Sequence, residues 1–508
     1  KKLAALKLPL PKIWAEFQSD PDYEHTSLIV PSLSVNQEEL AKVLGSSFYE
    51  ERLLFALIRL RNPNARVIYV TSMPVNPDII DYYLQLLDGV TLGHARQRLQ
   101  MVSVYDSSSR PLTEKILERP RLLGRLRNKL GDPARAYLTC YNSTVLERRL
   151  AVELGVPLNG VDPDLLYYGT KSGSREIFVE AGVNIPAGTS NLHSEEELVT
   201  ALVALAKERP QISRAVIKLN EGFAGEGNGI FTFPADKTDR RAIRDALHSL
   251  KWPSAQENFA TFMRKFNEMG GIVEEMIVAT EMRSPSVQLR IHPDGINAIV
   301  SSHEQVLGGS TGQVYLGCQF PARDDYRQFL HSEAQKIGQV LSSKGVLGRY
   351  GVDFLISREP GSDWTLHAIE INLRMCGTTP PFHALEFLTG GQLDRDSGLF
   401  YTPEGQAKFY SATDNLKSPA YRGLLPEDLF LIASRHGIHF RHATETGVLF
   451  YMIGALSQYG KLGMTCIGNS AEEAQSLFDR TVALLDEQTE GSDHGVAASM
   501  FDLYLNME

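Results

Sequence analysis

The spacing of apolar residues along this chain has two periods, one typical of β-strands and one typical of helices, and these predict its secondary structure. Over residues 1–160, short β-rich runs alternate with longer stretches whose apolar residues have helical spacing. The β-rich runs are 66–72, 99–105 and 135–141, and the helical stretches are 46–61, 77–87 and 112–130. Such alternation predicts a parallel sheet covered by helices. The dinucleotide fingerprint Gly-x-Gly-x-x-Gly is absent, so we interpret this part as a structural or substrate-shaping domain.

The pattern changes after residue 160. Glycine is frequent from about 161 to 400, where the residues with chemical character cluster, and a third region begins at about 401. Segment 303–320 is polar, rich in glycine and without a core pattern; long loops of this kind are usually functional or disordered, and we favour a substrate loop. Segment 410–429 is loop-like, with a helix starting at Pro426. Segment 448–460 is a buried strand or helix, and 470–488 is a helix capped by Ser470.

Residues 351–374 are consistent with two apolar strands joined by a Pro-Gly-Ser-Asp turn. If the turn centres on its Gly-Ser pair, Asp353 lies directly opposite Glu370; if it centres on its Pro-Gly pair, the two are diagonal neighbours on one face. Asn372 and Arg374 continue this face, because side chains repeat every two residues. Facing carboxylates repel each other, and a cation between them relieves the repulsion; hard oxygen ligands of this kind suit magnesium bridged to phosphates. The alternative is an exposed hairpin with solvated acids.

A lysine-bearing strand followed by a glycine-rich loop occupies residues 215–233. Lys218 lies on the strand, and the loop contains Gly222, Gly225, Gly227 and Gly229. Because glycine has no Cβ, such a loop can bring backbone N–H groups against phosphate oxygens, and the lysine adds positive charge. A flexible hairpin turn is the alternative for the loop taken alone. The order of lysine and loop is reversed relative to protein kinases, and the nearby Gly-Thr-Lys-Ser stretch lacks the glycines of a P-loop.

Composition narrows the classes of partner. The chain has 508 residues and a net charge of −10, with no long basic block and no apolar run of membrane-span length. We therefore expect neither nucleic acid nor a membrane as a partner. Nothing at the start resembles a signal peptide, and the four scattered cysteines suggest neither a disulfide framework nor a thiolate zinc site, so we expect a cytoplasmic location.

Two further motifs complete an ordered set. Lys171 precedes a helix that leads to Ala-Gly-Val-Asn-Ile-Pro, and an apolar strand at 270–282 carries Glu274 and Glu275, with Glu281 seven residues after Glu274. Together with the lysine and glycine loop and the Asp…Glu-x-Asn hairpin, these motifs resemble the ATP-grasp superfamily in kind and in order.

The resemblance implies that the chain binds ATP and magnesium. The residues implied for the phosphates are Lys171 from the core, Lys218 from a mobile lid, and the loop of Gly222, Gly225 and Gly227. Those implied for the nucleoside are Glu274 at the adenine amino group, the backbone of Glu275 and Ile277 at the ring edge, and Glu281 at the ribose. Asp353, Glu370 and Asn372 would hold one or two magnesium ions.

The catalytic arginine is implied less directly. Arg374 falls where many ATP-grasp ligases place an arginine against the transferred phosphate or the acyl intermediate. Some members also carry an arginine two residues before the metal aspartate, where this chain has Gly351. Arg349 or Arg290 are the candidates to substitute for it.

More narrowly, the whole chain resembles the pheganomycin-type ATP-grasp peptide ligases. The stretches that carry this resemblance are VPSLSVN with YEERLLFALIRLR, HEQVLGGSTGQVYLGCQFPA and TGVLFYMIGALSQYGKLGMTCIG. It implies an α/β and α+β architecture. The expected parts are a Rossmann-like pre-ATP-grasp domain (1–160), an ATP-grasp core (161–400) with a lid at about 186–278, and a small α+β C-terminal domain (401–508).

The expected activity is ATP-dependent carboxylate–amine ligation, which forms a peptide bond through an acyl phosphate in natural product biosynthesis. Glu304, Gly309 and Ser310 are the candidate substrate residues, and Glu304 is also a candidate base. The alternatives are an ATP-grasp enzyme of another reaction type, such as a carboxylase or acyl-CoA synthetase, or a nucleotide-binding module without catalysis. We expect small-molecule acid and amine or peptide substrates, with a homodimer as one option for assembly.

Overall fold

The N-terminal part is a parallel sheet covered by helices, as its sequence pattern predicts. The computed structural model describes residues 9–35, 40, 45–222, 227–250, 258–308 and 314–490. The four strands run in the order β3-β2-β1-β4, and every pairing is parallel. They are β1 (His25–Val30), β2 (Ala65–Thr71), β3 (Leu99–Ser103) and β4 (Ala136–Cys140). The pattern at 66–72, 99–105 and 135–141 therefore located three of them.

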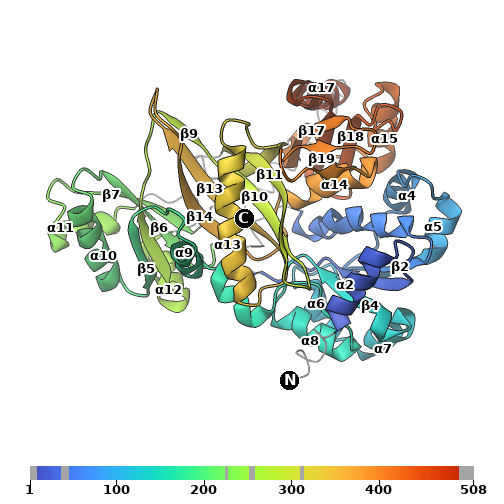
Figure 1. Ribbon diagram of the computed structural model, residues 1–508, viewed down its shortest axis with the longest axis horizontal. Helices are drawn as coiled ribbons and strands as arrows, with labels where there is room; N and C mark the ends of the chain where they lie inside the picture. Colours follow the sequence, from blue (N-terminus) through green and yellow to red (C-terminus); the bar gives the residue numbers. More distant parts are fainter. Residues whose placement is uncertain are drawn as a thin grey trace.

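Helices pack on both faces of this sheet (Figure 1). They are α2 (Pro9–Ser19), η1 (Ser46–Arg61), α4 (Pro77–Gln85), α5 (Leu92–Arg98), α6 (Leu112–Leu117), α7 (Pro120–Leu130) and α8 (Val145–Leu154), with the short turn η2 (Pro133–Arg135). The 46–61 stretch forms a 3₁₀ helix, and the 112–130 stretch is divided before Pro120, which lacks the N–H that an uninterrupted helix needs. Helix η1 is buried on several sides and reaches the C-terminal part of the chain.

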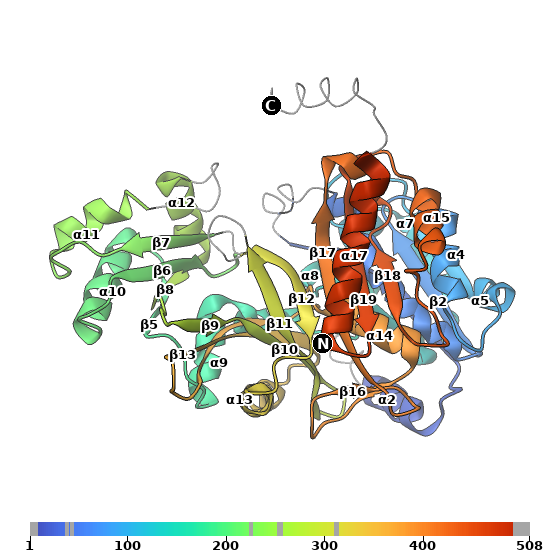
Figure 2. The same cartoon turned by 90° about the horizontal axis from the view of Figure 1, so that it is seen from above.

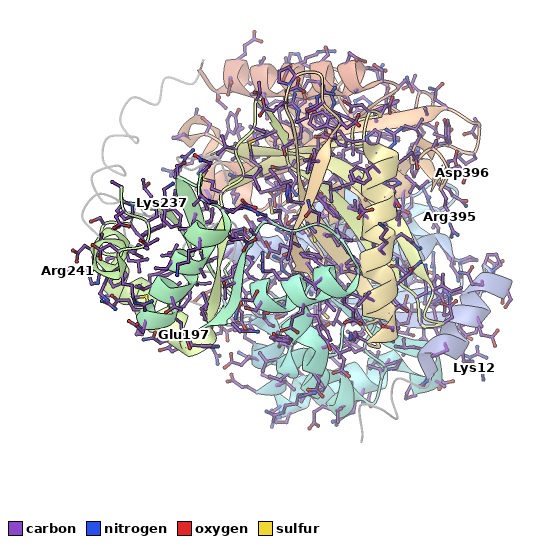
Figure 3. The ribbon with its side chains drawn as sticks, turned by 60° about the vertical axis from the view of Figure 1, so that its left-hand side comes forward. Lys12, Glu197, Lys237, Arg241, Arg395 and Asp396 are labelled. Carbon is purple, nitrogen blue, oxygen red and sulfur yellow. The ribbon has the colours of Figure 1, made fainter. Side chains whose placement is uncertain are left out.

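A small four-stranded sheet forms a lobe that projects to one side, at the left of Figure 1. Its antiparallel order β5-β8-β6-β7 is built from β5 (Gly188–Leu192), β6 (Arg214–Leu219), β7 (Asn228–Thr232) and β8 (Gly271–Glu275). Helices α10 (Glu195–Glu208), α11 (Arg240–Leu247) and α12 (Phe259–Met269) cover it. The lobe stands apart when seen from above (Figure 2), and Glu197, Lys237 and Arg241 lie on its outer surface (Figure 3).

An eleven-stranded sheet forms the centre of the molecule and continues into the C-terminal region. Its main path is β14-β13-β10-β11-β12-β17-β16-β15, with β9, β18 and β19 attached. The strands are β9 (Glu281–Arg283), β10 (Pro285–Ile291), β11 (Asn297–Gly308), β12 (Val314–Phe320), β13 (Gly348–Arg358), β14 (Thr365–Asn372), β15 (Gln392–Leu393), β16 (Phe400–Tyr401), β17 (Ala407–Lys417), β18 (Gly447–Tyr451) and β19 (Lys461–Gly468). Because β12 pairs with β17, hydrogen bonds cross the boundary that the sequence suggested near residue 400.

Helices on this sheet complete the fold. They are η3 (Pro163–Gly169), α9 (Lys171–Glu180), α13 (Arg327–Ser343), α14 (Thr379–Thr389), η4 (Pro419–Tyr421), α15 (Pro426–Arg435), α16 (Ala455–Tyr459) and α17 (Ala471–Glu490). Helix α13 lies across the central strands (Figure 1), and α15 begins at Pro426 as predicted. Within the described residues, no helix has the combination of length and apolar character needed to cross a membrane.

Two segments expected to be loops are strands. Residues 303–308 belong to β11 and residues 314–320 to β12, residues 309–313 lie outside the described residues, and the first part of 410–429 belongs to β17. Their polar residues misled the prediction because several are satisfied inside the sheet: His303 is fully buried and its Nε2 lies 2.6 Å from the Tyr410 hydroxyl, while the Ser411 hydroxyl bonds Gln475. Because these buried polar side chains have hydrogen-bond partners, the strands do not show the apolar pattern from which a strand is recognised in sequence.

The start of α9 allows a stability test. A Cβ added at Gly173 would overlap the backbone carbonyl of Tyr167, whereas one added at Gly124, inside α7, has nothing within 4 Å. We expect Gly173→Ala to destabilise the protein by about 1–3 kcal/mol, the usual cost of overpacking. Gly124→Ala should instead stabilise it by about 0.5–1 kcal/mol, because alanine has less backbone entropy to lose. Thermal or denaturant unfolding of the two variants measures both changes, and equal stabilities would contradict the close packing of α9 on η3.

Candidate active site

Two carboxylates face each other on β13 and β14 at the base of a cavity of about 750 Å³, which we call the main cavity. Asp353 is the direct partner of Glu370 in the strand register. The Asp353 carboxylate accepts hydrogen bonds from Gln305 Nε2 at 2.7 Å and from Asn372 Nδ2 at 3.0 Å. Burial, and then the charge of Glu370, raise the pKa of Asp353 to about 6. The pair is therefore short of positive charge.

Direct opposition arises in a way that neither turn alternative describes alone. The Ser362 N–H donates to the Glu359 carbonyl, and the strand pairs nearest the turn, such as Ser357 with Thr365, are centred on Gly361. A bulge between Asp353 and Phe354 then shifts the register, which brings Glu370 opposite Asp353. Bulges commonly re-aim side chains next to functional sites.

Lys171 supplies a cation to this face from the first turn of α9. Its ammonium forms an ion pair with Glu370, and both side chains are largely buried. Ser174 ties the helix to the hairpin, because its hydroxyl accepts a hydrogen bond from the Ile371 N–H at 3.0 Å. Arg374, two residues beyond Asn372, also lines the main cavity. The predicted residues Lys171, Asp353, Glu370, Asn372 and Arg374 thus lie together.

The oxygen ligands of this face fit magnesium. No group of three or more His, Cys, Asp or Glu side chains in the described part of the chain is arranged to hold a metal ion. Two carboxylates and an amide are nevertheless the kind of set that magnesium uses when substrate phosphates complete its shell. The ion pair of Glu370 with Lys171 shows that this face accepts positive charge.

Lys218 enters the main cavity from the lobe and is held by Glu274. Its ammonium pairs with one oxygen of the Glu274 carboxylate, and the other oxygen lies 3.3 Å from Nη1 of Arg175 on α9. All three side chains are at least nine-tenths buried. A buried charge network of this kind requires its partners, because an unpaired charge would lose its hydration without compensation.

Asn220, which the sequence interpretation missed, joins the two lysine-bearing elements. Its side-chain oxygen accepts hydrogen bonds from the Ser172 N–H and hydroxyl at 3.0 and 2.7 Å, and its backbone carbonyl accepts from the Lys171 N–H at 3.2 Å. It follows β6 directly, two residues after Lys218. A single buried asparagine in such a position gives no recognisable signal in one sequence.

Some, but not all, of the residues predicted for the glycine loop and the nucleoside line the main cavity. Gly222 lines the main cavity, Gly227 packs on Leu219, and Gly225 lies outside the described residues. Glu274, Glu275 and Ile277 all line the cavity. The backbone N–H of Glu275 already bonds the Ala187 carbonyl at 2.8 Å, and its carboxylate accepts from the Ala187 N–H at 2.9 Å.

Glu281 lies away from the cavity wall. Its carboxylate accepts a hydrogen bond from Arg358 Nε at 2.8 Å, on the edge pairing of β9 with β13. The neighbouring residue Met282 lines the cavity instead, because side chains alternate along a strand. Seven residues of separation from Glu274 could not reveal on which face Glu281 would lie.

Glu304 does not lie on either cavity described here. Its carboxylate accepts hydrogen bonds from the Tyr326 hydroxyl at 2.5 Å and the Arg323 N–H at 3.2 Å, on the side of α13. Gln305 and Leu307, on the opposite face of β11, line the main cavity. The proposal of Glu304 as base is therefore corrected, and Gly309 and Ser310 lie outside the described residues.

Arg290 and Arg349 line a different space. They are register partners on β10 and β13 and face a second cavity of about 440 Å³ between the N-terminal part and the central sheet. Gly351 cannot carry a side chain without movement, because a Cβ there would lie 2.5 Å from Cys376 Sγ. Both predicted arginines thus line the second cavity rather than the main cavity.

The end of the main cavity opposite the lobe was not foreseen. Arg52 of η1 pairs with Asp414 of β17 at 3.3 Å, and Lys461 of β19 donates to the Tyr49 hydroxyl at 2.7 Å. Burial lowers the pKa of Lys461 to about 8, partly offset by Asp414. These residues come from segments more than 350 positions apart, so only the tertiary fold brings them together.

Comparison with known proteins agrees with the fold. An ATP-grasp family model described as IQCH-like matches residues 165–233 and 241–396, and a model described as the PGM1 C-terminal domain matches 428–481. The chain is 30% identical over 470 residues to an L-propargylglycine–L-glutamate ligase of Streptantibioticus cattleyicolor, covering 91% of this chain and 94% of the relative. It is 22% identical to IQ motif-containing protein H of Danio rerio, covering 96% of this chain and 50% of that protein.

Solved structures share the fold at low identity. A biotin carboxylase complex from Campylobacter jejuni has a TM-score of 0.55 at 13% identity, covering 93% of this chain and 97% of its own. A biotin carboxylase domain of a Hydrogenobacter thermophilus 2-oxoglutarate carboxylase, solved with MgADP, also has a TM-score of 0.55, at 12% identity and with coverage of 90% and 89%. At the ligase relative's level of identity and coverage, the assignment is settled: the chain belongs to the ATP-grasp family, among its peptide-ligase-like members.

Proposed function

We propose that this protein uses ATP and magnesium to join an amino acid to a second amino acid or a peptide through an acyl phosphate. The observation that carries the proposal is the opposed pair Asp353 and Glu370, with Lys171 and Arg374 beside it, at the base of the main cavity. The printed name of the ligase relative, with L-propargylglycine and L-glutamate, supports amino acids as the class of substrate.

The nucleotide occupies the lobe side of the main cavity in this proposal. Lys171 and Lys218, now paired with Glu370 and Glu274, would share their charge with phosphate oxygens. Asp353, Glu370 and Asn372 would hold magnesium, which neutralises negative charge on the phosphates. Residues 275–277, where β8 ends, line the cavity beside Glu274 and supply its nucleoside side.

The chemistry needs an activated carboxylate, because a free carboxylate has a poor leaving group. One oxygen of the acid attacks the γ-phosphorus of ATP, the bond to the β-phosphate oxygen breaks, and ADP leaves. The amine then attacks the carbonyl carbon of the acyl phosphate, loses a proton, and expels phosphate. Arg374 and Lys171 contribute by positioning and by stabilising negative charge in the transferred group.

The amine must lose its proton, and Glu304 is not placed to accept it. Asp414 and Lys461 line the end of the main cavity away from the lobe. Because the pKa of Lys461 is lowered to about 8, a substantial fraction is neutral near that pH and can accept a proton. This end is therefore the proposed entry side of the amine.

The other reaction types receive less support. The carboxylase structures are similar at 12–13% identity, which establishes a shared fold only. A binding module without catalysis has no need of the opposed carboxylates, whose repulsion has a cost unless a cation is bound.

The metal face is tested by Glu370→Gln. The substitution keeps the side-chain volume but removes one charge from the proposed ligand set, so ADP formation should fall at least 100-fold at millimolar magnesium while the fold is retained. A coupled ADP assay and circular dichroism measure the two properties. Glu359→Gln on the exposed turn of the same hairpin is the control and should keep normal turnover. Normal turnover of Glu370→Gln would overturn the assignment.

The acyl phosphate is tested with isotope and a trapping nucleophile. Enzyme, ATP and a correct acid should give a hydroxamate when hydroxylamine replaces the amine. With ¹⁸O in the carboxylate, one label should appear in inorganic phosphate, because that oxygen attacks the γ-phosphorus and leaves with it. Mass spectrometry follows the label. Label in AMP, with release of pyrophosphate, would instead indicate adenylation and contradict the proposal.

The role of Lys461 is tested by separating the two half-reactions. In Lys461→Met, peptide formation should fall at least 10-fold, because the group that accepts the amine proton is lost. Hydroxamate formation, which reports activation of the acid, should stay within a few-fold of normal. A parallel loss of both products would place Lys461 in activation or folding rather than in proton transfer.

A further inference from the structure

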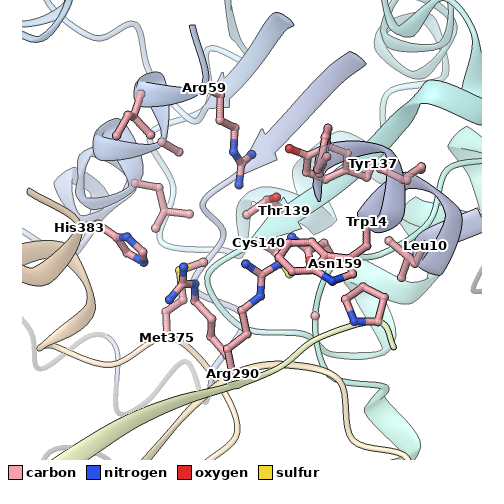
Figure 4. A pocket seen from close by; sticks show the side chains of 18 of the residues that line it. Leu10, Trp14, Arg59, Tyr137, Thr139, Cys140, Asn159, Arg290, Met375 and His383 are labelled. Carbon is pink, nitrogen blue, oxygen red and sulfur yellow. The ribbon is translucent and has the colours of Figure 1, made fainter. Parts of the chain in front are cut away.

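The second cavity is enclosed by three parts of the chain that are distant in sequence. Helix α2 forms one wall, β4 and η1 another, and the strands β10 and β13 the floor. In Figure 4, Arg59 and Arg290 reach into this space from opposite sides, with Trp14 and Leu10 at its edge. Tyr141 and Arg374 line both this cavity and the main cavity, so the two spaces are adjacent beside the proposed site of phosphoryl transfer.

Arginine predominates among the charged residues that line it. Its arginines are Arg59, Arg290, Arg349 and Arg374, and its carboxylates are Asp20 and Glu386. The Glu386 carboxylate pairs with Nδ1 of His383, and its negative charge also acts on Arg290 and Arg349. Burial lowers the pKa of that histidine to about 4, so it adds no charge at neutral pH. The lining therefore has more positive than negative charge.

Arg290 and Arg349 are the pair of charges in this lining that most needs a counter-charge. They are directly paired in the register of neighbouring strands, where like charges repel. Nη1 of Arg349 is buried and has no hydrogen-bond partner among the described residues. Burial, and then the charge of Arg349, lower the pKa of Arg290 to about 9. The single charge of Glu386 offsets only part of this repulsion, and a second anion beside the two guanidinium groups would offset the rest.

The remaining walls are apolar and aromatic. Leu10, Ile13, Trp14 and Phe17 of α2 line the cavity. The Arg290 guanidinium lies 4.9 Å from the centroid of the Trp14 ring, and that ring stacks on His292 at 4.4 Å. A ligand that fits must therefore combine a negative group with a carbon skeleton.

We propose that the second cavity binds the acid substrate through a carboxylate that does not react, with Arg290 and Arg349 as its counter-charges. The proposal rests on the ligase function and names the substrate class: an acid with two carboxylates, such as a dicarboxylic amino acid. One carboxylate reaches Arg374 and is phosphorylated, and the other stays at the arginine pair. The acid rather than the amine is assigned here because Arg374 lines this cavity, whereas Asp414 and Lys461 line the far end of the main cavity.

The test compares Arg290→Gln and Arg349→Gln with the unmodified enzyme. The probes are L-aspartate, L-glutamate and L-2-aminoadipate, each beside analogues that lack one carboxylate charge, namely the side-chain amide and the decarboxylated amine. For the acid that supports ADP release, both variants should raise its KM 10- to 100-fold, with kcat and the KM of ATP within a few-fold. The singly charged analogues should bind weakly to all three proteins alike.

Arg135→Gln is the matched control. Arg135 also lies over an aromatic ring, that of Tyr23 at 5.7 Å, and pairs with Glu24, but it does not line either cavity. It should leave every KM unchanged. Unmoved ATP affinity in the two test variants shows that they remain folded.

Calorimetric titration with L-glutamate, in the presence of magnesium and a non-hydrolysable ATP analogue, separates this proposal from the ligase function. If the unmodified enzyme binds L-glutamate, the arginine variants do not, and no acid supports ADP release, the subsite is supported and the ligase function is rejected. Turnover of a dicarboxylic acid with an unchanged KM in both variants would reject the subsite and keep the ligase. A rise in the KM of the amine alone, or failure of the unmodified enzyme to bind or use any of the three acids, would overturn the subsite.

Discussion

The repulsion between Asp353 and Glu370 is the constraint on which the rest of the site depends. Two carboxylates directly opposed in a sheet are unfavourable unless positive charge is supplied, and Lys171 supplies part of it. The bulge beside Asp353 creates this opposition, because the pairing nearer the turn, continued without the bulge, would have set Ile369 opposite Asp353. The hairpin thus maintains an arrangement whose full stabilisation requires a ligand, as expected where function takes precedence over local stability.

A second charge network connects this face to the lobe. Glu274 holds Lys218 with one oxygen and Arg175 of α9 with the other, while Asn220 hydrogen-bonds the beginning of α9. Helix α9 also carries Lys171, so both phosphate-binding lysines of the proposal belong to one connected set of interactions. Transfer of Lys218 from Glu274 to a phosphate would leave Arg175 as the remaining partner of that glutamate. The position of the lobe and the charge state of the cavity are therefore coupled.

The parts of the site that depend on local sequence were predictable. Strand alternation and the Asp…Glu-x-Asn spacing predicted that Asp353, Glu370 and Asn372 share one face, and the two lysines lie on the expected elements. The sequence did not predict which face of a strand meets the cavity, because tertiary pairing decides this. Glu304 and Glu281 each lie on the side of their strand away from the main cavity. The polar strands β11 and β17 were taken for loops, because their buried polar groups are satisfied by partners that no local window contains.

The walls of the proposed acid and amine sites are built from several distant segments, so no single sequence motif predicts them. β17 pairs with β12, so the wall bearing Asp414 is hydrogen-bonded into the same sheet as the metal face rather than attached by a linker. Helix η1 contributes Arg52 to that wall and Arg59 to the second cavity, and thereby links both substrate sides to the N-terminal part. With both walls fixed to one sheet, a change of substrate requires only changes in the side chains that line them. The proposed ATP site can then be combined with different acids and amines, since Asp353, Glu370 and Lys171 need not move.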